Sequence, residues 1–160
     1  MRRAVCLLMA TSVLGLGLTL ALGASAQPTT PVIPDTVARK MLELGLQNIH
    51  RALCDGFNQC APATPAEFET PPVTIDQARA AIIIGGRTAF VRWCGFDGDR
   101  RSVLPFMQQL RQSKQYNERQ LALMAVIHGI QHSITAEQLK AKGKCDQAMR
   151  SRLDAQLPKS

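Results

Sequence analysis

The stretch of the chain that decides its fold is residues 75–94, which read IDQARAAIIIGGRTAFVRWC. Apolar side chains occupy most of the circumference of a helix drawn through these residues, and a helix of that kind belongs in the centre of a bundle. Thr74 and Gln77 have the spacing of a capping box, in which each side chain accepts a hydrogen bond from the other residue's backbone amide. The sequence therefore predicts a central helix that begins just after Thr74.

Gly85 and Gly86 lie in the middle of this predicted helix. A glycine inside a helix costs about 1 kcal/mol relative to alanine, so another interaction must offset the pair. The simplest explanation is a close crossing by a neighbouring helix, or a bend. The alternative is a ligand that approaches the backbone at this point.

Two further predicted helices flank the central one in sequence. Residues 36–54 carry an apolar stripe at intervals of three and four, and Gly56 follows as a stop signal. Residues 103–114 follow Ser102 or Asp99, either of which can cap a helix.

The last third of the chain is also helical in pattern. Asn117 and Gln120 repeat the capping-box spacing and open the next predicted helix. Thr135 opens a short fifth piece, which Gly143 ends, and a terminal helix follows. The apolar stripes of the two longer helices are Leu123, Ile127, Ile130 and Ile134, and then Cys145, Met149, Leu153 and Leu157.

These patterns predict an all-α fold, because no run of alternating residues is long enough for a strand. We expect a compact domain over residues 35–158, with five or six helices packed like a bundle and two disulfides. A proline-rich lead-in, residues 27–34, precedes it. Residues 55–73 form one long loop, and a loop of this length in a compact domain is either a functional surface loop or a cover for exposed core.

The first 26 residues have the pattern of a cleaved secretory signal peptide. Arg2 and Arg3 supply the positive start, residues 4–22 are apolar and uncharged, and residues 24–26 are small. An uncleaved membrane anchor is the alternative, because about 20 apolar residues can span a bilayer. Either case places the domain outside the cytoplasm, and we expect a periplasmic or secreted protein with no stable transmembrane segment after cleavage.

Composition and charge limit the kinds of partner. The chain has 160 residues, 46% of them hydrophobic and 19% charged, which excludes a disordered or collagenous protein. Without the leader, 17 basic and 12 acidic residues remain, so the net charge is 17 − 12 = +5. This charge favours a protein partner or an anionic envelope component. Tyr116 and Trp93 are the only residues of their types, so no stacking platform for nucleic acid is expected.

Four cysteines remain after the leader, and an even number in an oxidising compartment predicts two disulfides. Three connectivities are possible, and we favour Cys54 with Cys60 and Cys94 with Cys145, because the first two flank a short turn that can bring their sulfurs together. The longer bridge stabilises the fold by about 4 kcal/mol and the shorter by about 2 kcal/mol on the chain-entropy model. The alternative, a thiolate metal site or redox pair, lacks the Cys-x-x-Cys spacing.

His128 and His132 form the best metal candidate, because residues four apart project from the same side of a helix. The alternative is that both rings are polar edges, hydrogen-bonded to a neighbouring helix or to water. Asp97 and Asp99 resemble part of a calcium loop, but the bidentate Glu that ends such a loop is missing.

Arginines gather in and just after the central helix. An anion-binding or partner-binding surface is one interpretation, and pairing with nearby acids, or a place at the solvent edge, is the other. The candidates are Arg87, Arg92, Arg100 and Arg101.

No catalytic or cofactor signature of high specificity occurs in the chain. The leading hypothesis is therefore an exported, periplasmic-type small helical protein that binds a partner without catalytic activity and without a cofactor. It presents the long loop and the arginine-bearing surfaces to that partner. The alternative is a metal or small-ligand binder that uses His128 and His132 with zinc or copper, and an uncharacterised enzyme is third.

Overall fold

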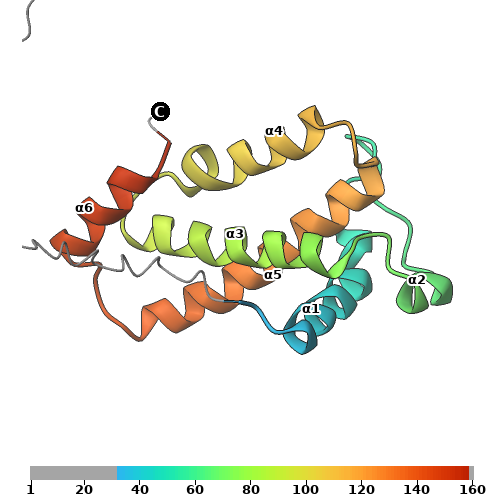
Figure 1. The fold of residues 1–160 in the computed structure, drawn as a ribbon, viewed down its shortest axis with the longest axis horizontal. Helices are drawn as coiled ribbons and strands as arrows, with labels where there is room; N and C mark the ends of the chain where they lie inside the picture. Colours follow the sequence, from blue (N-terminus) through green and yellow to red (C-terminus); the bar gives the residue numbers. More distant parts are fainter. Residues whose placement is uncertain (1–31, 159–160) are drawn as a thin grey trace, which may run out of the picture. The chain divides into compact units, whose positions relative to one another are not determined.

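The computed structural model describes residues 32–158. The predicted signal peptide and most of the lead-in lie outside the described residues. The described chain contains six α-helices, one 3-10 turn and one π-helical turn. Figure 1 shows how the α-helices are arranged. They are α1 (Asp35–Asn48), η1 (Ile49–Arg51), α2 (Pro65–Glu69), α3 (Ile75–Trp93), η2 (Asp99–Val103), α4 (Leu104–Gln112), α5 (Glu118–Lys140) and α6 (Gln147–Gln156).

The all-α prediction is confirmed for this part of the chain. Between residues 32 and 158 the only β-type pairing is an isolated bridge from Leu53 to Gln59, and no strand forms. None of the described helices combines the length and the apolar character that a membrane span requires.

Helix α3 lies at the centre of the packing, as its sequence predicts. It packs along α5 and also against α1 and η2. Its predicted capping box is present, because Oγ1 of Thr74 accepts from the amide of Gln77 at 3.2 Å and Oε1 of Gln77 accepts from the amide of Thr74 at 2.7 Å. The box at Asn117 and Gln120, which opens α5, is present as well. These two boxes fix where the two longest helices begin.

Helices α3 and α5 approach each other closely at Gly85. A Cβ atom added there would lie 2.5 Å from the backbone oxygen of His128 and 2.9 Å from Cβ of Gln131. At Gly86 the nearest atom would be Oγ1 of Thr135 at 3.7 Å, which is an ordinary contact. The close helix crossing offered as the simplest explanation for the glycine pair is therefore present, and Gly85 alone requires it.

Three helix boundaries differ from the sequence-based prediction. The first helix does not reach Cys54: it ends at Asn48, where the side-chain amide donates to the backbone oxygen of Leu44 and the chain tightens into η1. The predicted break at Thr135 is wrong, because Thr135 is buried and accepts from Gln131 within a continuous α5. The third predicted helix begins earlier, with the π-helical turn η2 ahead of α4.

Both predicted disulfides are present, Cys54 to Cys60 and Cys94 to Cys145. The second joins the C-terminal cap of α3 to the segment before α6, 51 residues further on. Helix α6 itself contributes no buried residue. Covalent attachment therefore compensates for the apolar packing that α6 lacks.

Candidate functional site

The long loop, residues 55–73, is more ordered than its composition indicates. It contains a short helix, α2, which the sequence-based prediction missed. The signal was present: Thr64 and Glu67 form a capping box, and Pro65 occupies the first helical position, where a missing amide proton costs nothing.

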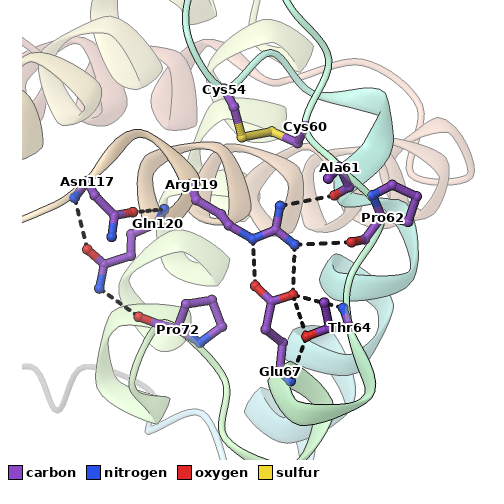
Figure 2. A network of polar contacts seen from close by, with 10 residues as sticks. All are labelled: Cys54, Cys60, Ala61, Pro62, Thr64, Glu67, Pro72, Asn117, Arg119 and Gln120. Carbon is purple, nitrogen blue, oxygen red and sulfur yellow. Dashed lines mark hydrogen bonds and ion pairs between the residues drawn. A yellow bond between two sulfur atoms is a disulfide. The ribbon is translucent and has the colours of Figure 1, made fainter.

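Arg119, in the first turn of α5, holds the middle of the long loop (Figure 2). Its Nε lies 2.5 Å from Oε1 of Glu67 and its Nη2 lies 2.8 Å from Oε2, so the pair is bidentate. The same guanidinium donates to the backbone oxygens of Ala61 at 3.0 Å and Pro62 at 3.4 Å. One side chain thus binds two carbonyls and one carboxylate from the loop.

The burial and the pKa values of Arg119 and Glu67 both indicate that this ion pair stabilises the conformation of the loop. The side chains of Arg119 and Glu67 are 26% and 19% exposed. The hydrogen bonds from Arg119, helped by the backbone amide of Thr64, lower the pKa of Glu67 to about 2, and Glu67 in turn raises the pKa of Arg119. Both groups are charged at neutral pH, and bidentate charge-assisted bonds of this kind fix geometry.

The two ends of the long loop are fixed separately. Near its end, the side-chain amide of Gln120 donates to the backbone oxygen of Pro72 at 2.7 Å (Figure 2). At its start, the disulfide from Cys54 to Cys60 closes what we call the closed turn, residues 54–60. The loop is therefore tied to α5 at its middle and its end, and its start is closed on itself by the disulfide.

Inside the closed turn, Asp55 organises the backbone. Its Oδ1 accepts from the amides of Phe57 at 3.3 Å and Asn58 at 2.7 Å, and its Oδ2 accepts from Nδ2 of Asn58 at 2.8 Å. These bonds, the side-chain bond from Asn58 foremost, lower the pKa of Asp55. Gly56 has a φ of +84°, a conformation that residues with a side chain rarely adopt. The side chain of Phe57 is left 93% exposed.

A groove of about 570 Å³ lies between α1 and the second part of the long loop. Phe68, on α2, is 42% exposed and lines it. The other lining residues are Arg39, Leu42, Glu43, Leu46, Glu69, Pro71, Val73, Thr74 and Ile75. The wall is mostly apolar with charged residues of both signs, and the volume is that of a small binding site.

The histidine pair lies away from this groove, with His128 buried in the core and His132 partly buried beside it. The rings of His128 and His132 stack with centroids 6.3 Å apart. His128 is only 9% exposed, and its Nε2 lies 3.1 Å from Oγ1 of Thr88, which also contacts Ser102 at 2.7 Å and the backbone oxygen of Ile84 at 2.8 Å. A hydroxyl donates only once, so all three contacts are satisfied when Thr88 donates to Ile84 and the Nε2–H of His128 donates to Thr88.

This arrangement occupies the Nε2 atom of His128, which a metal would otherwise use. Among residues 32–158, no three His, Cys, Asp or Glu side chains form a group that could hold a metal ion. Protein zinc sites use at least three such ligands. His128 and His132, the predicted zinc or copper ligands, therefore have no third ligand within the described part of the chain.

Acid should weaken the fold through His128. Burial, followed by the nearby His132 and Arg92, lowers the pKa of His128 to about 4, while Asp99 acts in the opposite sense. An unfolded chain binds this proton near pH 6.5 and the folded chain only near pH 4, so this stabilisation is lost as the pH falls between those values. We expect the free energy of unfolding to drop by about 3 kcal/mol from this group.

Urea unfolding between pH 7 and pH 4 measures this loss. The matched variant is His128→Gln, whose amide can still donate to Thr88 but does not titrate. Its unfolding free energy should depend less on pH than that of the wild type. The same slope in both proteins would show that His128 is not the titrating group.

Two of the four predicted surface arginines fasten the C-terminal segment. Arg87 donates to the backbone oxygen of Gln156 at 2.8 Å. Arg101 is 12% exposed, pairs with Asp154 at 2.6 Å and donates to the backbone oxygen of Pro158 at 3.1 Å. Their contacts hold α6 and the residues after it against α3 and η2.

The other two pair with acids close in sequence. Arg92 lies 2.7 Å from Asp99, and Arg100 lies 3.8 Å from Asp97. Arg100 is 75% exposed, so its pair contributes little to stability. Each of the four arginines thus has an acidic or backbone partner within the chain.

No protein-family model, no curated protein and no solved structure matches this chain. The fold and the geometry of the long loop therefore carry the functional argument by themselves. For residues 32–158 they define an all-helical, doubly disulfide-bonded domain with a long, partly apolar loop that is held by an ion pair, hydrogen bonds and a disulfide.

Proposed function

We propose that this protein is an exported binding protein without catalytic activity, which engages a protein partner through the long loop and its groove. The observation that carries the proposal is the Arg119 clamp. It uses a bidentate ion pair and two backbone contacts to hold one conformation of a loop that leaves apolar side chains in water.

This combination of rigidity and exposure favours binding. Fixing a loop before it meets its partner reduces the ordering cost of association. Phe57 and Phe68, on the first and second parts of the long loop, are both aromatic and exposed, and aromatic residues are enriched where interfaces gain most of their energy. Export is supported by the two disulfides, since such bonds persist in oxidising compartments.

A photo-crosslinking experiment in the protein's own host tests the proposal. Benzoylphenylalanine replaces Phe68 in the groove, or Leu104 on α4 as a matched control, because these two side chains are 42% and 48% exposed. We expect irradiation to give a discrete protein adduct from position 68 that is absent from position 104. Adducts of equal yield at both positions, or none at position 68, would refute binding through the groove.

A further inference from the structure

We propose that Phe57 is the central contact of this interaction, inserting into an apolar pocket on a protein partner that carries a basic group at the rim of the pocket. The inference rests on the proposed function. It adds the residue that makes the contact and the chemistry of the surface that receives it.

Phe57 gains almost no burial within the described fold. Its side chain is 93% exposed, more than that of any other large hydrophobic residue between positions 32 and 158. Burial of an aromatic ring is favourable, so a ring held in water gains stabilisation only when a second surface covers it. Leu53, 54% exposed, is paired with Gln59 in the bridge at the base of the turn and adds apolar surface nearby.

Backbone hydrogen bonds, a disulfide and bonds to Asp55 restrain the tip of the closed turn. The amide of Cys54 donates to the backbone oxygen of Asn58 at 3.0 Å, and the amide of Cys60 donates to that of Ala52 at 2.8 Å. The disulfide and the three bonds to Asp55 add to this restraint. A ring on a pre-ordered turn loses less conformational freedom on binding than one on a mobile loop, so more of its burial energy is retained as affinity.

The charge beside the ring selects the class of partner. Asp55, two residues away, is exposed, and its carboxylate is ionised at neutral pH, as that of an ordinary aspartate is. The headgroups of an anionic bilayer would repel this carboxylate if Phe57 entered the membrane. A protein pocket with a Lys or Arg at its rim is complementary, because the apolar floor receives the ring while the cation meets Asp55.

The test places benzoylphenylalanine at position 57 in the host and identifies the adduct by mass spectrometry. The affinity of the purified adduct partner is then measured for the wild type and four variants: Phe57→Ala, Asp55→Asn, Leu104→Ala and the double variant Cys54→Ser, Cys60→Ser. Vesicles of phosphatidylethanolamine and phosphatidylglycerol at 3:1 are the lipid probe. Since Phe57 and Leu104 are both exposed, we expect their substitutions to leave the fold intact.

We expect a protein adduct, a loss of affinity of about 30-fold or more for Phe57→Ala, and a change within about twofold for Leu104→Ala. Asp55→Asn should bind more weakly with less dependence on salt, and the cysteine double variant about tenfold more weakly. Unchanged affinity of Phe57→Ala, a lipid adduct, or vesicle binding that requires Phe57 would overturn the inference. An adduct at position 68 without one at position 57 would overturn it and leave the proposed function standing, whereas no adduct at either position would refute both.

Discussion

Replacing Gly85 by alanine should destabilise the protein by about 3 kcal/mol or more. The new Cβ would lie 2.5 Å from the backbone oxygen of His128 and 3.2 Å from the backbone nitrogen of His132. These are backbone atoms of a helix, so no side chain can rotate away and α3 must move from α5. Because α3 and α5 share the most extensive contact in the described fold, this displacement disturbs side-chain packing throughout the core.

Gly86→Ala is the matched control, one residue further along the same helix. Its Cβ would meet only Oγ1 of Thr135 at 3.7 Å. This variant should be neutral or more stable by up to about 1 kcal/mol, because alanine favours the helix over glycine. Urea unfolding followed by circular dichroism measures both variants, and equal effects of the two substitutions would contradict the close crossing at Gly85.

Removing the bridge between Cys94 and Cys145 should have the second large effect. The bond closes a loop of 51 residues, and its loss should cost about 4 kcal/mol. For a domain of this length that lowers the melting temperature by about 10–15 °C. The double variant Cys94→Ala, Cys145→Ala tests this by calorimetry, and hydrogen exchange should show that the amides of α6 lose protection first.

The control is the pair Cys54→Ala, Cys60→Ala. That bridge spans only six positions, so its loss should cost about 2 kcal/mol and leave α6 protected. Other contacts also hold this region. Nε1 of Trp93 donates to the backbone oxygen of Gly143 at 2.8 Å, ahead of α6, and Arg87 and Arg101 bind the C-terminal part of α6 and the residues after it. If removing the long bridge cost no more than removing the short one, these contacts and not the bridge would hold α6.

Local signals in the sequence predicted the features that depend on neighbours in the chain. The capping boxes at Thr74 and Asn117 are contacts three residues apart, and the central helix follows from its own apolar composition. The disulfide pairing was also predictable, because a short turn favours Cys54 with Cys60 and only one pairing then remains. Such features require no knowledge of the tertiary fold.

The Arg119 clamp was not predictable in the same way. A cation in the first turn of a helix opposes the helix dipole, which is a signal that Arg119 needs a partner. Nothing local indicates that the partner is Glu67, 52 positions away. The burial of His128 was not predictable either, because it depends on a tertiary contact. Helix α3 crosses α5 at Gly85 and brings Thr88 to the His128 ring.

The rigidity of the long loop is the central claim, and hydrogen exchange of its amides in the wild-type protein at neutral pH tests it most directly. The amides of Asn58, Cys60, Thr64 and Glu67 all donate within the structure. We expect them to exchange about 100-fold or more slowly than in an unstructured peptide, and those of Thr64 and Glu67 to lose this protection in Arg119→Met. Exchange of these amides in the wild type at the rate of an unstructured peptide would contradict the account.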